Sequence, residues 1–135
     1  MNIITLKPGK DKPIRRHHHW IFSGAIASAP DFANGDILGV QSSTGDWLGY
    51  GYFHHQTSIS GRMLSFDEIP GEQSLLQNID KAIAYRGLLF DHKTTNAYRL
   101  VNSEGDGIPG LVIDRYDDVL VLQVSTLGIE KLKPL

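Results

Sequence analysis

Turn residues divide the first 66 residues into five short apolar segments. The segments span 2–6, 19–26, 37–43, 47–53 and 58–66, and most of the intervals between them contain Gly, Pro or Asp. Short, closely spaced segments bounded by turn signals predict strands of a small barrel. Gly49 and Gly51 interrupt the aromatic-rich strand "WLGYGYF". Glycine inside a strand commonly marks a bend or bulge, so we expect the barrel to close there.

The pattern changes after Pro70 and Gly71. Apolar residues at helical spacing predict one helix over about 72–90, with Glu72 at its amino-terminal end, where an acid is favourable. The segment 97–101 follows, and 111–116 and 119–125 predict a β-hairpin that turns at Asp117-Asp118. The last ten residues predict the start of another helix. The sequence therefore predicts an α+β chain, with a barrel over 1–68 and a helix plus β-hairpin over 69–135.

Charge is distributed unevenly along the chain. Residues 1–20 hold five basic residues against one acid, or +4, and the remaining residues hold eight bases against fourteen acids, or −6. A basic arm on an acidic body predicts a polyanionic partner that touches one edge, although a solvated terminus has the same composition. No apolar run approaches the roughly 20 residues that span a bilayer, and no signal peptide is recognisable. We expect no membrane partner and a cytoplasmic location.

The loop "GDGIPG", residues 105–110, matches the glycine pattern of dinucleotide-binding sites. That pattern needs a helix after the last glycine, and the β-branched segment 111–125 predicts strands instead. Pro109 also lacks one of the amides that would hold a pyrophosphate. Asn102, Glu104 and Asp106 imitate the start of a calcium loop, but Ile113 stands where its last carboxylate belongs. We therefore expect a turn, with no cofactor bound.

Histidines raise the question of a metal. His17, His18 and His19 are consecutive, His17 and His19 would share a strand face, and a second pair is His54-His55. Zinc needs three or four ligands in fixed geometry, and no carboxylate lies nearby in the sequence. The chain has no cysteine. We expect no metal, and a metal-binding histidine protein is kept as one alternative class.

The basic arm and its neighbours supply the candidate RNA contacts. Cationic side chains neutralise phosphates, and flat rings stack on unpaired bases. The candidate residues are Lys7, Lys10, Lys12, Arg15, Arg16, His18, Trp20 and Arg62. Arg62 is isolated in an apolar run, where an internal acid is as good a partner as a phosphate. Of Trp47, Tyr50, Tyr52 and Phe53, we expect at least half to be core residues.

Four stretches resemble a known family: "RRHHHWIFSGAI", "GDILGVQSSTGDWLGYGYF", "SISGRMLSF" and "YRLVNSEGDGIPGLVIDRYDDVLVLQVSTLG". The family is that of the PUA-containing, S-adenosylmethionine (SAM)-dependent methyltransferases that modify cytosine C5 of 23S rRNA. The resemblance covers essentially the whole chain, and His18-His19-Trp20 stands where the family has His-Pro-Trp. It implies a PUA-like barrel that binds RNA, then a small segment, then a SAM-binding domain.

The resemblance also implies that catalysis lies outside these 135 residues. A cytosine-5 methyltransferase adds a cysteine thiolate to the ring, and this chain has none to offer. We therefore expect an RNA-targeting fragment that is inactive alone, without catalytic residues, whose SAM site belongs to a missing carboxy-terminal domain and whose partner is 23S rRNA. The main alternative is a stand-alone PUA-like module that binds a small ligand or a protein.

Overall fold

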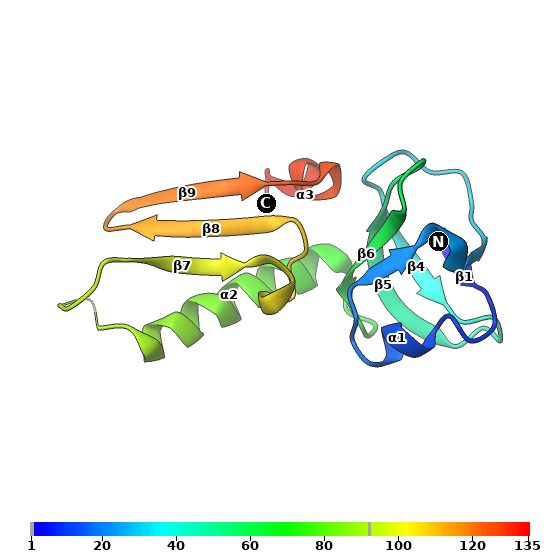
Figure 1. Ribbon diagram of the computed structural model, residues 1–135, viewed down its shortest axis with the longest axis horizontal. Coiled ribbons are helices and arrows are strands. Elements are labelled where there is room, and N and C mark those ends of the chain that lie inside the picture. Colours follow the sequence, from blue (N-terminus) through cyan, green and yellow to red (C-terminus); the bar gives the residue numbers. More distant parts are fainter. Residues whose placement is uncertain (1, 92) are drawn as a thin grey trace.

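The computed structural model describes residues 2–91 and 93–135, and it divides into a curled sheet and a helix-backed sheet (Figure 1). The first part contains β1 (Ile3–Leu6), α1 (Lys12–Arg15), β2 (Trp20–Phe22), the 3-10 turn η1 (Ser23–Ala25), β3 (Ile26–Ser28), β4 (Ile37–Gln41), β5 (Trp47–Phe53) and β6 (Ile59–Ser65). The second contains α2 (Gly71–Leu89), β7 (Ala97–Asn102), the 3-10 turn η2 (Ser103–Asp106), β8 (Leu111–Tyr116), β9 (Val119–Val124) and α3 (Leu127–Leu132). The predicted α+β class is confirmed.

The six strands of the first part curl into a barrel-like sheet. Their order is β2-β6-β5-β4-β1-β3, so β2 and β3 lie at opposite edges. Only the three residues of η1 separate these two strands along the chain. The sheet must therefore curl until its edges meet. The prediction of one continuous strand over 19–26 is wrong, because the chain leaves one edge at Ser23 and enters the other at Ile26.

Gly49 makes the bend that the sequence predicts in β5. Its φ of 133° is left-handed, and a Cβ there would lie 2.0 Å from the carbonyl oxygen of Ser65 on β6. Only glycine allows this close approach, and the register between β5 and β6 shifts immediately afterwards. The resulting curl encloses an apolar core of Ile4, Leu6, Ile14, Ile21, Leu38, Val40, Leu48, Phe53 and Met63.

The second part is a three-stranded antiparallel sheet in the order β7-β8-β9, with α2 packed along β7. The predicted hairpin is present as β8 and β9, and Asp117 takes the left-handed φ of 57° at its turn. The segment 97–101 joins that hairpin as a third strand. Arg86 of α2 forms two hydrogen bonds, of 2.6 and 2.8 Å, with the largely buried carboxylate of Asp106. This pair fixes the helix against η2.

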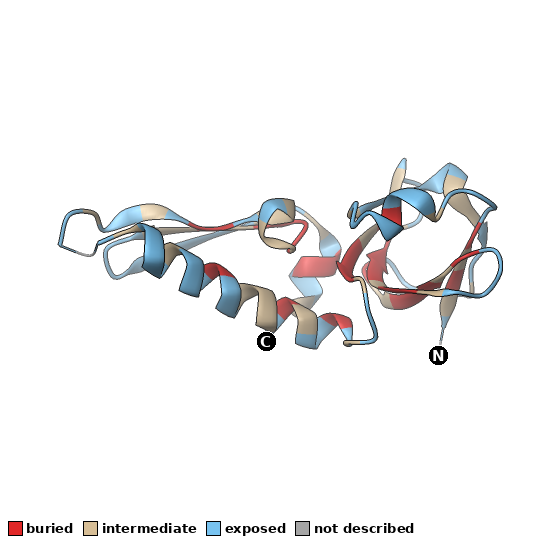
Figure 2. Cartoon of the chain, turned by 90° about the horizontal axis from the view of Figure 1, so that it is seen from below, coloured by how far each residue is buried: buried red, intermediate tan, exposed pale blue. Residues whose placement is uncertain are grey.

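Tyr52 joins the two parts. Its side chain is fully buried, and its hydroxyl donates to the carbonyl of Pro109 at 2.8 Å and accepts from Thr126 Oγ1 at 2.9 Å. A Cβ at Gly128 would lie 2.3 Å from the Tyr52 ring, so the amino-terminal turn of α3 lies against that ring. Figure 2 shows that the buried residues concentrate in the barrel and at this junction. Of the four aromatic residues in β5, Tyr52 and Phe53 are buried, as predicted for at least half.

The far edge of the second sheet is exposed. Val119, Leu120, Val121 and Leu122 of β9 each keep about half of their surface accessible. No further strand pairs with β9 in residues 2–91 and 93–135. Among the described helices, none combines the length and apolarity that crossing a membrane requires.

Candidate nucleic-acid interface

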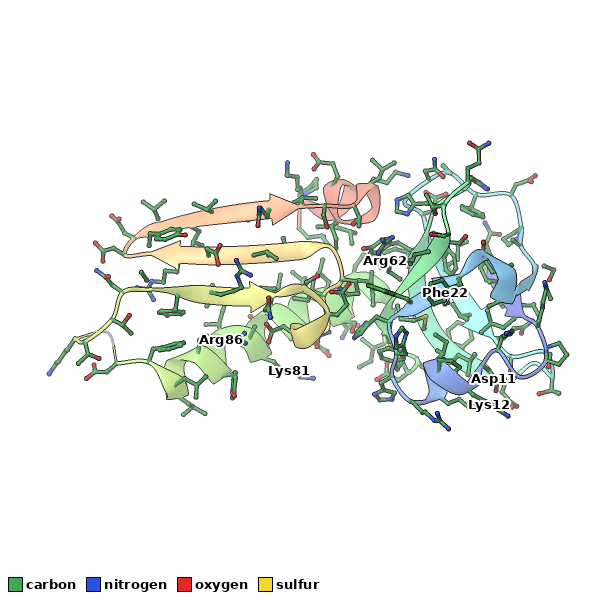
Figure 3. The ribbon with its side chains drawn as sticks, viewed as in Figure 1. Asp11, Lys12, Phe22, Arg62, Lys81 and Arg86 are labelled. Carbon is green, nitrogen blue, oxygen red and sulfur yellow. The ribbon has the colours of Figure 1, made fainter. Side chains whose placement is uncertain are left out.

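The basic arm, residues 7–16, contains the short helix α1. Ile14 is the buried residue of α1 and packs in the barrel core, so its neighbours Lys12 and Arg16 are exposed to solvent. Figure 3 shows Lys12 at the end of the barrel remote from the three-stranded sheet. Four of the five cations of the arm form no ion pair within the described residues; they are Lys7, Lys10, Lys12 and Arg16. Their charge is available to an external anion.

Arg15 differs from the other cations of the arm. Its guanidinium contacts Asp11 at 2.6 Å and Asp46, in the turn before β5, at 2.7 Å. The hydrogen bond from Arg15 lowers the pKa of the Asp11 carboxyl below its usual value. Two carboxylates therefore balance the charge of Arg15, which holds α1 against the turn between β4 and β5. We assign Arg15 a role in positioning the arm.

An apolar cleft, here called the Trp20 cleft, lies between α1 and β2. It has a volume of about 550 Å³ and is lined by Lys10, Pro13, Ile14, His18, Trp20, Ile21, Phe22, Gly24 and Ala25. Successive side chains of β2 point to opposite faces of the strand. Ile21 therefore enters the barrel core, while Trp20 and Phe22 form the wall of the cleft and remain 37% and 50% exposed. The structure thus brings together the predicted residues Lys10, His18 and Trp20.

Phe22 belongs to the same group, although the sequence pattern did not identify it as a candidate. Its ring meets Trp20 edge to face, with centroids 6.4 Å apart. His18 meets Trp20 in the same manner at 6.0 Å. The i, i+2 spacing of Trp20 and Phe22 was the available signal, because such residues share one face of a strand.

Arg62 lies outside the arm. It is the cross-strand partner of both Trp20 and Tyr52, and Figure 3 shows it on the side of the barrel that faces the second part of the chain. Arg62 is half-buried, and no acid within the described residues forms an ion pair with it. The alternative of an internal carboxylate partner is therefore not supported. Arg62 is one strand away from the Trp20 cleft.

The three consecutive histidines make separate contacts. The His17 ring stacks on Phe66 with centroids 4.5 Å apart, and the Nδ1 of His18 accepts a hydrogen bond from the backbone amide of Trp20. His19 Nδ1 donates to the carbonyl of Met63 at 2.8 Å, and burial lowers the pKa of its ring. Within the described part of the chain, no three potential ligands gather as a metal site requires. These contacts give the histidines packing and hydrogen-bonding roles.

The glycine loop is a tight connection in which three amides donate internal hydrogen bonds. The amides of Gly107 and Ile108 donate to the carbonyls of Glu104 and Ser103, and the amide of Gly110 donates to the hydroxyl of Ser103. Strand β8 follows Gly110, where a nucleotide site needs a helix. The loop therefore does not fit the phosphates of a dinucleotide or the carboxylate of SAM.

The acids of the same loop have partners from other elements. Asp106 binds Arg86 of α2 and the backbone amide of Asn102. Glu104 accepts a hydrogen bond of 3.1 Å from the indole nitrogen of Trp20, across the junction. Arg86, Asn102 and Trp20 thus account for the carboxylates that resemble a calcium loop, and Glu104 reaches the wall of the Trp20 cleft.

Comparison with known proteins identifies a domain type and several similar proteins. The sequence model of the PUA-like domain matches residues 4–66. The ribosomal RNA large subunit methyltransferase I of Alteromonas mediterranea is 41% identical over 131 residues, which are 95% of this chain and 33% of that protein. The chain is therefore similar to one third of this methyltransferase over nearly its own whole length. The Aliivibrio fischeri methyltransferase I is 36% identical over 135 residues, covering 98% of this chain and 34% of that protein.

The chain spans about a third of the length of these methyltransferase I relatives. Among solved structures, a protein of Streptococcus mutans described as a SAM-dependent methyltransferase superposes with a TM-score of 0.82. The superposition covers 99% of this chain and 35% of that one, at 20% identity. It shows that the two share the fold of this segment, and the predicted PUA-like barrel is confirmed.

Proposed function

We propose that this chain is the RNA-binding part of a ribosomal RNA cytosine-5 methyltransferase and that its basic arm binds phosphates of large-subunit rRNA. One observation carries the proposal: on a PUA-like barrel, the arm holds four cations that form no ion pair within residues 2–91 and 93–135, and it lies beside an aromatic cleft. When exposed cations bind phosphates, they displace the counterions condensed on the nucleic acid, and this release drives association. The similarity to ribosomal RNA large subunit methyltransferase I supports large-subunit rRNA as this RNA.

The same proposal assigns methyl transfer to another part of the longer protein. The chain has no cysteine to add to cytosine, and three amides of its glycine loop, those of Gly107, Ile108 and Gly110, donate to neighbouring residues of the turn. SAM would supply the methyl group when bound in the longer protein, and the residues described here would bind and orient the RNA. The proposal also divides the chain at about residue 68 into an RNA-binding barrel and a helix plus β-hairpin segment. It includes a cytoplasmic location.

The decisive experiment measures affinity for a large-subunit rRNA fragment as a function of salt concentration. The variant Lys12→Ala/Arg16→Ala removes two arm cations and leaves Arg15 and its two carboxylates intact. The control Lys81→Ala/Lys93→Ala removes the same charge from α2 and the connection to β7, where both side chains are exposed.

The slope of log affinity against log salt should fall by about 1.4 to 1.8 in the arm variant, since each phosphate contact contributes about 0.7 to 0.9. The control should keep the slope of the unmodified chain. Equal slopes for the two variants would refute the role of the arm. Absence of salt-dependent RNA binding would favour the stand-alone ligand- or protein-binding module, and a chelator-sensitive melting temperature would favour the metal alternative.

A further inference from the structure

The Trp20 cleft has the composition of a binding site for a flat, mostly apolar group. Apart from Lys10 and His18, its lining is apolar or aromatic, and its volume of about 550 Å³ falls within the range of small-molecule sites. Apolar side chains of α1 form one wall, and the rings of β2 form the other. A nucleobase is flat and apolar on its faces, and it stacks on aromatic rings of this kind.

The Trp20 ring is held in place before any ligand binds. Its indole nitrogen donates to Glu104 Oε1 at 3.1 Å, and the planes of Trp20 and Phe22 are nearly perpendicular, at 84°. Trp20 is nevertheless 37% exposed as a residue. A surface ring with a fixed orientation loses little conformational freedom on binding, which favours affinity.

Charge around the cleft fits a nucleotide. Lys10 lines the cleft, and Lys12 and Arg16 lie on and directly after α1, which forms the adjacent wall. A nucleotide places its anionic phosphate beside its base, so a base in the cleft would bring its phosphates toward these cations. An apolar peptide would gain nothing from them. In an intact duplex the bases are paired and stacked, and their faces are inaccessible to such a cleft.

We propose that the Trp20 cleft receives one unpaired nucleobase of the bound RNA, stacked on Trp20 and met edge to face by Phe22, with Glu104 as the residue that positions Trp20. The chain then recognises single-stranded or bulged RNA in preference to a continuous duplex. Stacking tolerates any base, so we expect little preference for base identity. The inference rests on the proposed RNA-binding function and adds the form of RNA that this surface accepts.

The first test observes Trp20 directly. Trp47→Phe removes the other tryptophan of the chain and leaves Trp20 as its only indole. Tryptophan fluorescence is followed while a single-stranded RNA of on the order of eight nucleotides, or a duplex of the same sequence, is added. Quenching by the single strand, at lower concentrations than by the duplex, is the expected result.

The second test compares uncharged substitutions. Phe22→Ala and Trp20→Ala should weaken single-stranded binding roughly 5- to 150-fold, as loss of one stacked base does, while the salt slope stays unchanged. Tyr85→Ala is the matched control, because Tyr85 is an exposed aromatic residue of α2, outside the cleft. Glu104→Ala should weaken binding and shift Trp20 emission, and Glu104→Gln, which keeps an acceptor oxygen, should restore both. Circular dichroism confirms that each variant is folded.

The outcomes separate the cleft from the arm. If Phe22→Ala and Trp20→Ala bind single strands as tightly as Tyr85→Ala, while the arm variant still loses salt dependence, the base site is refuted and RNA binding stands. Equal affinity for single strand and duplex also refutes it. A cleft that serves an apolar peptide predicts the same unchanged RNA binding. If no RNA binds to the unmodified chain, the proposed function fails together with the inference.

Discussion

Tyr52→Phe tests whether one hydroxyl joins the barrel to the second part of the chain. The substitution keeps the buried ring and removes a donor to Pro109 and an acceptor for Thr126, at 2.8 and 2.9 Å. Each buried hydrogen bond contributes about 1 kcal/mol net, so we expect a loss of about 2 kcal/mol. For a chain of this size that corresponds to a fall in Tm of about 8 °C.

Urea and thermal unfolding, followed by circular dichroism at neutral pH, measure this loss. Tyr50→Phe is the control, because Tyr50 lies on the same strand and its hydroxyl makes no hydrogen bond within the described residues. We expect Tyr50→Phe to change the free energy of unfolding by less than about 0.5 kcal/mol. Equal effects of the two substitutions would show that the Tyr52 hydroxyl does not stabilise the junction.

Unfolding at alkaline pH provides a second test of the Tyr52 hydroxyl, with the unmodified chain and Tyr52→Phe compared. Burial raises the pKa of Tyr52 to about 12, above its ordinary value of 10.0. The stabilisation by the protonated Tyr52 hydroxyl is complete below pH 10 and is lost as pH rises toward 12. The reason is that, with rising pH, Tyr52 loses its proton in the unfolded chain before it does so in the folded chain. At pH 11 the loss is about 1.4 kcal/mol. The advantage of the unmodified chain over Tyr52→Phe should therefore shrink to below about 1 kcal/mol, and a constant difference would contradict the assignment.

Four further substitutions test the second part of the chain by thermal unfolding. Arg86→Met leaves the largely buried carboxylate of Asp106 without its partner and should lower the free energy of unfolding by about 3 to 5 kcal/mol. Arg99→Met breaks an exposed pair and should lower it by less than about 1 kcal/mol. Similar losses for the two variants would contradict the burial argument. Gly128→Ala places a methyl group against the Tyr52 ring and should destabilise the chain by about 1 to 3 kcal/mol. Gly87→Ala meets no atom within 4 Å inside α2 and should stabilise it by up to about 1 kcal/mol, so a destabilised Gly87→Ala would argue against the helix assignment.

Local patterns predicted most elements of this fold. The helix expected over 72–90 is α2 at Gly71–Leu89, and the hairpin strands lie within a residue of their predicted bounds. Two features were missed because they carry no periodic signal. Helix α1 has four residues, too few to show a helical repeat, and Gly24 lies where the chain crosses between sheet edges that only the closed barrel brings together.

The candidate interface was predicted in part, for a similar reason. Exposed cations and the rings of His18 and Trp20 are visible as residue types in one stretch of sequence. The contact of Arg15 with Asp46 joins residues 31 positions apart, and that of Trp20 with Glu104 joins residues 84 positions apart. Neither contact has a local signature, since each depends on how the strands associate. The residue types of the candidate interface can therefore be read from the sequence, whereas the ion pairs of Arg15 and the hydrogen bond of Trp20 require the three-dimensional structure.

The exposed edge at β9 has a practical consequence for anyone handling this chain. Its sequence, VLVLQV, has no charge, proline or glycine, and its outer backbone groups have no partner strand in the described part of the chain. Six-residue segments of this composition are prone to pair between molecules and to form fibrils. Concentrated samples should therefore lose monodispersity through this strand first. A lysine at Val121 would introduce the kind of charge with which natural sheets keep their edges soluble.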